Sequence, residues 1–190
     1  MTRRIGILLP LLFITTAGCT SVSAGQPRPG ASESPSPDEQ TSTSVSAPPA
    51  RPRDIRLDDV DPCTLLPQAD FAGYGLDKPG ERSSDDNGAS TCAWYGDLGA
   101  MDANLVTHEG VEAREGRLLQ IGPADPIDGF PAYTGTLPGD DMVCFIAVDV
   151  ADGQYLDVQV RLYSLPAGVD SVCDYAHQFA SSIMSTLVKR

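Results

Sequence analysis

Residues 144–162, CFIAVDVADGQYLDVQVRL, decide the fold because two alternating runs flank a turn. Apolar side chains occupy every second position on both sides of the turn at 151–153. They are Cys144, Ile146, Val148 and Val150 before the turn, and Leu156, Val158, Val160 and Leu162 after it. Successive side chains of a strand point to opposite faces of a sheet. This alternation therefore predicts a β-hairpin with one apolar face.

Weaker patterns on the N-terminal side of the hairpin extend this fold. An opening helix is expected to begin with Asp61 as its cap and Pro62 in its first turn, and to continue through 68–74. Short strands are expected at 91–95, 103–107 and 130–137. The polar segment 78–90 reads as a loop, and 109–120 is ambiguous with a helical preference.

A last helix follows the hairpin. Asp170 or Ser171 can cap it, and one apolar stripe runs along it, formed by Val172, Ala176, Phe179, Ile183 and Leu187. The patterns together predict an α+β domain over residues 54–190. It consists of an antiparallel sheet of about five strands on which an N-terminal and a C-terminal helix pack.

The start of the chain has the features of an export signal. Arg3 and Arg4 precede an apolar run at 5–14, which is shorter than the roughly 20 residues needed to cross a bilayer. The next residues, Thr16-Ala17-Gly18-Cys19, resemble the bacterial lipobox, with Thr16 in place of the usual leucine. In lipoproteins with this motif the cysteine receives a diacylglycerol and becomes the first residue. We therefore expect residues 1–18 to be a signal peptide and Cys19 to be lipidated.

The alternative for this segment is ordinary secretion, which would leave Cys19 as a free or paired thiol. Residues 19–53 are expected to form a disordered tether, since they are rich in Pro, Ser and Thr and almost lack large apolar side chains. Loss of Arg3 and Arg4 would leave 11 basic and 26 acidic residues, a net charge of −15. That charge argues against nucleic acid as a partner.

Four cysteines remain besides Cys19, and disulfides persist outside the cytoplasm. Of the three possible pairings, we favour Cys63–Cys92, which joins the opening helix to the first strand, together with Cys144–Cys173, which joins the hairpin to the last helix. A zinc site built from Cys173, His177 and Cys144 is an alternative. The oxidising compartment disfavours it, and no metal or other cofactor is expected.

No catalytic constellation is recognisable in the sequence. The two histidines, His108 and His177, lie in no zinc-protease motif, and no nucleophile elbow is present. The segment 85–88 reads as a solvated turn, and the adjacent acids Asp140 and Asp141 as exposed loop residues. Three aromatic residues are candidates for a ligand-binding groove, namely Trp94, Tyr133 and Tyr155. The alternative for Trp94 is core packing against a disulfide, because it shares a strand face with Cys92.

The order of these motifs resembles an actinobacterial lipoprotein family known as domain of unknown function 3558. The matching stretches cover nearly all of 58–188 and are Asp61-Pro62-Cys63-Thr64-Leu65-Leu66, Cys92-Ala93-Trp94, Gly129-Phe130-Pro131-Ala132, Cys144, the run from Val148 to Gln154, and Cys173 on a final helix. The resemblance implies a lipid-anchored protein of the cell envelope. It supplies no catalytic residues.

The sequence therefore favours a non-enzymatic binding or protein-interaction module on the extracytoplasmic face of the cell membrane, anchored by lipid on Cys19. Its partner would be an envelope protein or a small-molecule ligand. One alternative is a small-molecule or lipid carrier with an apolar pocket between sheet and helix. Another is a cell-wall hydrolase that uses scattered carboxylates.

Overall fold

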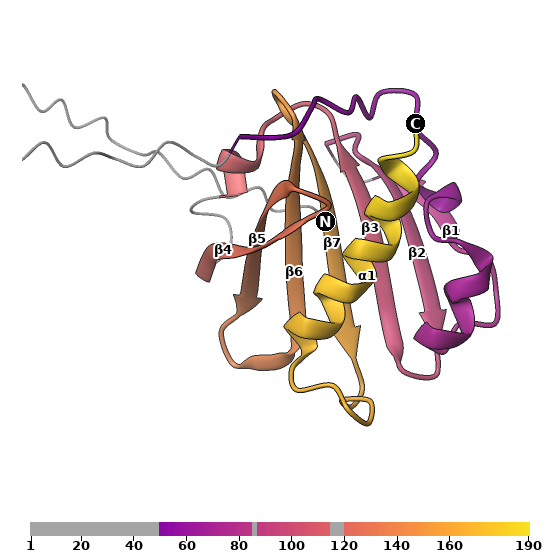
Figure 1. Cartoon of the computed structure of the whole chain (residues 1–190). Helices are drawn as coiled ribbons and strands as arrows, with labels where there is room; N and C mark the ends of the chain where they lie inside the picture. Colours follow the sequence, from indigo (N-terminus) through magenta and orange to yellow (C-terminus); the bar gives the residue numbers. More distant parts are fainter. Residues whose placement is uncertain (1–49, 85–86, 115–119) are drawn as a thin grey trace, which may run out of the picture. The chain divides into compact units, whose positions relative to one another are not determined.

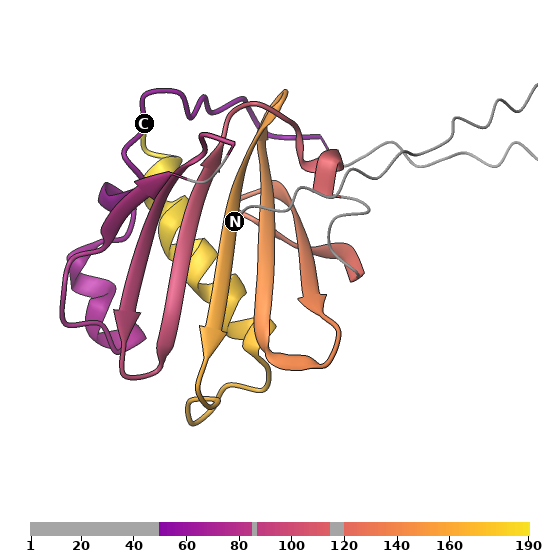
Figure 2. The same cartoon turned by 180° about the vertical axis from the view of Figure 1, so that it is seen from behind.

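The computed structural model describes residues 50–84, 87–114 and 120–190. The predicted signal peptide, Cys19 and most of the predicted tether lie outside these residues. The described residues form one α+β domain, in which a single long helix lies on one face of a twisted sheet (Figures 1 and 2).

Seven strands form one antiparallel sheet within the described residues, in the order β1-β2-β3-β7-β6-β5-β4. The strands are β1 (Glu81–Ser84), β2 (Ser90–Gly96), β3 (Gly99–Val106), β4 (Gln120–Ile127), β5 (Phe130–Leu137), β6 (Asp140–Ala151) and β7 (Gln154–Leu162). The predicted hairpin is β6–β7, in the middle of the sheet, with Ala151 opposite Gln154 across the turn. All eight apolar residues of its predicted inner face are buried. This prediction is confirmed.

The sheet is larger than the predicted five strands, and both extra strands lie at its edges. β1 occupies part of the segment expected to be a polar loop, and all four of its residues are exposed. β4 contains Pro123 and shifts register between Ala124 and Ile127. An edge strand pairs on one side only, so it tolerates proline and needs no apolar alternation. Neither strand therefore leaves the periodic signal on which the prediction relied.

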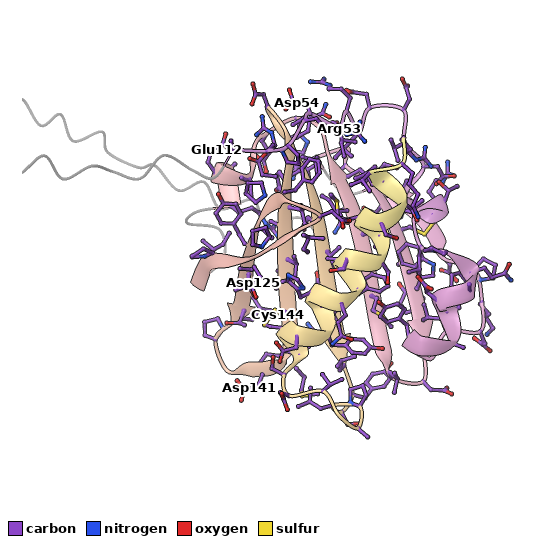
Figure 3. All side chains as sticks on the ribbon, viewed as in Figure 1. Arg53, Asp54, Glu112, Asp125, Asp141 and Cys144 are labelled. Atoms are coloured by element: carbon purple, nitrogen blue, oxygen red, sulfur yellow. A yellow bond between two sulfur atoms is a disulfide. The ribbon has the colours of Figure 1, made fainter. Side chains whose placement is uncertain are left out.

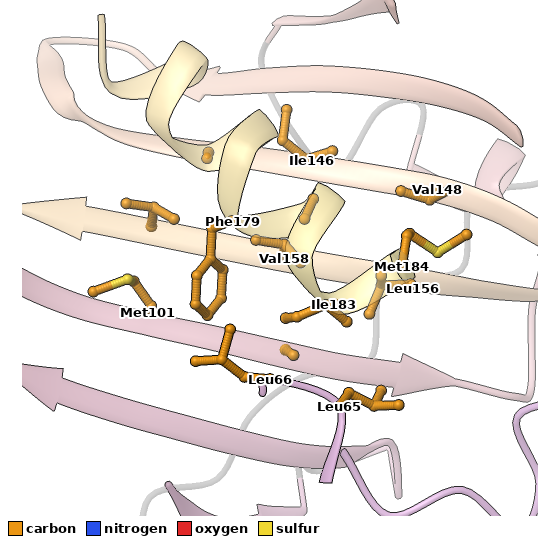
Figure 4. Packing of buried hydrophobic residues seen from close by; sticks show 14 of the residues in the cluster. Leu65, Leu66, Met101, Ile146, Val148, Leu156, Val158, Phe179, Ile183 and Met184 are labelled. Carbon is orange, nitrogen blue, oxygen red and sulfur yellow. The ribbon is translucent and has the colours of Figure 1, made fainter. Parts of the chain in front are cut away.

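Helix α1 (Val172–Leu187) covers the sheet and closes the core. Ser171 caps it, because its hydroxyl accepts a hydrogen bond from the Asp174 N–H at 3.1 Å. The predicted apolar stripe of α1 is buried throughout. Figure 4 shows Phe179 and Ile183 packed against side chains of the central strands. This core fills the space between α1 and the central strands, and an open hollow of about 320 Å³ lies between the first turns of α1 and strands β4–β6.

The predicted N-terminal helix is not present as an α-helix. Its sequence forms two short 3₁₀ helices, η1 (Pro62–Thr64) and η2 (Gln68–Tyr74). Asp61 does cap η1, since its carboxylate accepts a hydrogen bond from Cys63 N–H at 3.0 Å. Pro67 then interrupts the helix, because it has no N–H to donate, and Gly75 ends η2 in a left-handed conformation with φ 66°.

Two disulfides staple the described domain, in the pairing favoured from the sequence. Cys63–Cys92 joins η1 to β2, and Cys144–Cys173 joins β6 to α1. Cys92 and Cys144 are fully buried. Both η1 and α1 are therefore tied covalently to a strand of the sheet.

The segment before η1 crosses the end of the β6–β7 hairpin. Ile55 N–H donates to Val150 O at 2.8 Å, and Leu57 N–H donates to the side-chain oxygen of Gln154 at 2.8 Å. Ile55 and Leu57 are buried in the core. Arg51, which the sequence assigns to the tether, also contacts the domain here, through Asp149 of β6.

Candidate functional site

The three aromatic candidates do not share one groove. Trp94 is only 1% exposed and lies in the core, with its ring 5.7 Å from that of Phe179 in an edge-to-face contact. Its role is packing beside the Cys92 disulfide, the alternative that the sequence left open. Tyr133 and Tyr155 lie on the opposite face of the sheet, away from α1.

We call this opposite side the outer face. Strand register places on it Thr91 of β2, Asn104 and Val106 of β3, Tyr155 and Asp157 of β7, Ala147 and Asp149 of β6, and Tyr133 of β5. A short 3₁₀ helix, η3 (Val111–Arg114), covers part of it, in the segment where the sequence favoured helix. Figure 2 views the molecule with the sheet in front of α1 and shows η3 near one end of the strands. The part of the ambiguous segment at 115–119 lies outside the described residues.

A pocket of about 290 Å³ opens on one side of η3. We call it the apolar pocket, and its lining consists of Val111, Glu112, Ile121, Gly122, Pro123, Tyr133 and Asp149. Its walls come from η3, β4, β5 and β6, so residues from four elements converge on it. Most of the wall is nonpolar, and the carboxyl groups of Glu112 and Asp149 also line it.

Arg51 reaches the rim of the apolar pocket from the start of the described chain. Its Nη1 donates to both oxygens of Asp149 at 2.8 Å, and its guanidinium also contacts Asp152 and Asp54. Figure 3 labels Asp54 and Glu112 near the same end of the sheet. One cation from the chain is therefore held by three carboxylates, one of which lines the pocket.

The carboxyl group of Asp149 lies in a region of competing charges. Burial raises the pKa of Asp149 above its usual value, and the hydrogen bonds from Arg51 oppose this rise. The nearby carboxylates of Glu112 and Asp152 raise the pKa further by repulsion. The pocket therefore has a local excess of negative charge that Arg51 only partly offsets.

A second pocket, of about 150 Å³, opens on the other side of η3. We call it the polar pocket, and it is lined by Asn87, Asn104, Val106, His108, Glu109, Arg114, Tyr155 and Asp157. Its base is an ion pair between the guanidinium of Arg114 and the carboxylate of Asp157. Asn104 donates from its side-chain amide to the backbone oxygen of Asp157 and accepts from the Thr91 hydroxyl at 2.7 Å.

The Arg114–Asp157 pair is largely removed from water. Asp157 is 7% exposed, and burial raises its pKa to about 6 against the opposing charge of Arg114. The guanidinium of Arg114 also lies over the rings of Phe145 and Tyr155, 5.5 Å and 6.0 Å from their centres. These contacts hold η3 on the outer face.

Tyr155 and the first histidine border the same pocket. The Tyr155 hydroxyl donates to Glu109 at 3.3 Å, and burial raises the pKa of Tyr155 well above its usual value. His108 lies with its Nε2 4.0 Å from Glu109. These groups form a hydrogen-bonding lining that suits recognition of a polar group.

The zinc alternative does not fit the described domain. Cys144 and Cys173 are joined in a disulfide, so neither offers a thiolate. His177 instead contacts the backbone oxygen of Asp125 at 2.9 Å. No cluster of metal-ligating side chains occurs among the residues that the structure describes. Asp140 pairs with Arg161 at 3.0 Å near the protein surface, and Asp85 and Asp86 lie outside the described residues.

Sequence reasoning found two aromatic residues of the outer face and missed the charged ones. Arg51 was assigned to the tether, and Glu112, Arg114 and Asp157 were not singled out. Arg51 meets Asp149 across 98 positions of sequence, and Arg114 meets Asp157 across 43. No local pattern connects positions so far apart. Asp157 lies opposite Asn104 on neighbouring strands. This polar pair could have marked Asp157 as a candidate, but it is recognisable only when the register of β3 and β7 is known.

Comparison with models of protein families shows which family the chain belongs to. Residues 14–186 match the family described as protein of unknown function (DUF3558). The chain belongs to the DUF3558 family. The match covers most of the sequence, including both disulfides and both pockets of this DUF3558 domain. No curated protein and no solved structure matches the chain significantly. Within the described residues, no helix combines the length and the apolar character that a membrane span requires.

Proposed function

We propose that this DUF3558 chain is a lipid-anchored binding module of the cell envelope, and that it recognises its ligand or partner with the outer face of the sheet. The observation that carries the proposal is the pair of pockets on either side of η3. One pocket supplies nonpolar walls, and the other supplies hydrogen-bonding groups. Ligand sites commonly combine such nonpolar walls with a few placed polar groups.

A non-enzymatic role agrees with the state of the buried acids. General acid–base catalysis needs a carboxyl group that can exchange a proton with the substrate. Both oxygens of Asp149 accept hydrogen bonds from Arg51, and Asp157 is paired with Arg114. The apolar pocket does contain two carboxylates, Glu112 and Asp149, so the hydrolase alternative keeps a cleft. The hydrogen bonds from Arg51 make Asp149 less able to exchange a proton with a substrate.

The carrier alternative is favoured by the nonpolar lining of the apolar pocket, although not in the place expected from the sequence. The hollow between α1 and strands β4–β6 has a mixed lining that includes Asp125, Asp174 and His177, whereas the apolar pocket lies on the other face of the sheet. Its volume of about 290 Å³ is at the small end of ligand sites. A carrier of this size would hold a small molecule rather than a whole membrane lipid.

The proposal is tested by screening small fragments against residues 20–190 with amide chemical shifts as the readout. We expect responding amides to group around η3 and the outer ends of β5–β7. Responses grouped instead around Tyr74 and Tyr175, where a shallow hollow borders α1, would contradict the choice of face. An absence of responses at the outer face with every fragment would also contradict it.

Anchoring is tested separately with Cys19→Ala in the full chain. We expect the variant to leave the membrane fraction, because the thiol that would carry the lipid is missing and a nonlipidated domain of this charge has little affinity for anionic lipid. The measurement is the distribution of the protein between membrane and soluble fractions. Cys63→Ala serves as the matched cysteine control. A Cys19→Ala protein that remains in the membrane fraction would refute lipid anchoring at this residue.

A further inference from the structure

The apolar pocket has a chemical character that narrows the class of its ligand. Its nonpolar wall includes Val111, Ile121 and Pro123, and Tyr133 contributes an aromatic ring. Glu112 and Asp149 add carboxylates to the same wall. No Lys, Arg or His is among the described residues that line it. An anionic ligand would therefore meet repulsion, whereas a cation would meet opposite charge.

We propose that the apolar pocket binds an organic cation with a compact apolar body, such as a substituted ammonium ion. This inference rests on the proposed function, because it assigns a ligand class to one of the two pockets of the outer face. The apolar body would contact the nonpolar wall, and the cationic group would lie near Asp149 and Glu112. Tyr133 can add attraction through its ring, since aromatic faces attract cations.

The guanidinium of Arg51 is itself an organic cation, and Asp149 binds it at the rim of the apolar pocket. The guanidinium donates to both carboxylate oxygens at 2.8 Å while its side chain stays mostly buried. It belongs to the chain just before the folded domain rather than to the wall of the pocket. Arg51 also contacts Asp54 and Asp152. It therefore keeps two carboxylate partners when a ligand shares Asp149 or displaces Arg51 from it.

The local charge balance favours a second cation. Three carboxylates surround the single guanidinium of Arg51, and Glu112 adds a fourth negative group close enough to act on Asp149. The net charge of the whole chain is also negative, at −13. A negative surface raises the local concentration of cations and speeds their encounter.

The probe for the test is benzyltrimethylammonium, a rigid organic cation with one aromatic ring. Phenylacetate and benzyl alcohol serve as anionic and neutral comparisons of similar size. Each is titrated into residues 20–190, and the amides of Val111, Gly122 and Ile121 report on the pocket. We expect shifts at these amides with the cation, and weak or no shifts with the two comparisons.

Two substitutions at the rim should change the affinity in opposite directions. Asp149→Asn removes one carboxylate and should weaken binding about tenfold, as expected for loss of roughly 1.4 kcal/mol. Arg51→Ala removes the competing guanidinium and should tighten binding by severalfold. Both directions matter, because a substitution that merely damages the fold would weaken binding in each case.

Asp140 and Arg161 provide a matched control pair. They form a similar ion pair, with an N–O distance of 3.0 Å, but neither lines the apolar pocket. Asp140→Asn and Arg161→Ala change the net charge by the same amounts as the rim variants. We expect them to leave the affinity for the cation within about twofold, which a general charge effect would not do.

The outcomes separate this inference from the proposed function. Equal shifts with phenylacetate or benzyl alcohol at the pocket amides, unchanged by Asp149→Asn, would overturn the cation class while the outer face remained the binding face. A cation affinity that follows net charge in all four variants would overturn it too. Failure of every probe and fragment to shift any outer-face amide would overturn both.

Discussion

Asp157 is an acid on the polar side of β7 in the sequence pattern, yet the fold leaves it only 7% exposed. The covering groups come from η3, whose Arg114 both neutralises the carboxylate and stacks on neighbouring rings. Burial of a charge is tolerated when a partner compensates it. At the scale of single residues, therefore, the outer face is defined by ion pairs that the alternation of one strand does not reveal.

The raised pKa of Asp157 gives a pH dependence with a defined sign. Burial raises its pKa from the ordinary 3.8 to about 6, so the folded state binds this proton more tightly than the unfolded state. The resulting contribution to stability is present at low pH and is lost as pH rises from about 4 to about 6.

Asp157→Asn should remove this dependence. We expect the free energy of unfolding of the wild type to fall, relative to that of the variant, as pH rises from 4 to 6.5. A pH-independent offset is also expected, because the variant presents an amide to Arg114 where the wild type has a carboxyl group. Urea unfolding at several pH values measures both effects, with the exposed Asp141→Asn as control. Parallel curves for wild type and Asp157→Asn would contradict the prediction.

At the scale of elements, the start of β3 depends on one close backbone approach. Gly99 faces β7, and a Cβ atom at this position would lie 2.0 Å from the carbonyl oxygen of Arg161. Its φ of 155° is also one that side-chain-bearing residues rarely adopt. The pairing of β3 with β7 joins the two halves of the sheet, so this glycine affects the sheet as a whole.

Gly99→Ala should therefore destabilise the domain by about 2 kcal/mol or more, at the upper part of the usual range for single substitutions. The measurement is urea unfolding at neutral pH. Gly73→Ala is the matched control, because nothing lies within 4 Å of the position its Cβ would take. We expect the control to change stability by less than about 0.5 kcal/mol. Equal effects of the two substitutions would show that the contact at Gly99 relaxes easily.

At the scale of the molecule, two disulfides tie the layers together. Each joins residues 29 positions apart, η1 to β2 in one case and β6 to α1 in the other. Equal loop lengths predict equal entropic stabilisation, so differences between the bridges would report on packing rather than on loop closure.

Replacement of either pair by alanines, Cys63→Ala with Cys92→Ala or Cys144→Ala with Cys173→Ala, should cost about 3–4 kcal/mol. Urea unfolding without reductant measures the loss. Wild-type protein with a reducing agent should lose stability from both bridges, which provides an internal comparison. A loss below about 1 kcal/mol for either pair would mean that the unfolded chain gains little freedom when that bridge is absent.

The sequence predicted those elements whose apolar residues recur with a regular period within the element itself. The β6–β7 hairpin and α1 carried complete apolar periodicities, and both were confirmed together with the cysteine pairing. The edge strands β1 and β4 were missed because one is wholly exposed and the other contains proline. The prediction of an opening α-helix was wrong, because Pro67 divides this segment into two short 3₁₀ helices.

The candidate site was predictable only in part. Tyr133 and Tyr155 were identified as candidates, and Trp94 proved to be a core residue beside Phe179. The charged groups of the two pockets were missed, since each meets its partner across a long stretch of chain. An arginine in a proline-rich segment offers no sign by itself that it will bind a carboxylate on a central strand.

The sequence by itself determined which faces are apolar, where the central hairpin turns and which helix covers it. These are local properties, because side-chain periodicity follows directly from strand and helix geometry. Only the tertiary structure decided that Arg51 meets Asp149 and that Arg114 covers Asp157. Those contacts depend on the register of β6 and β7 and on the path of the chain over the outer face. The apolar pocket exists because four elements distant in sequence converge there.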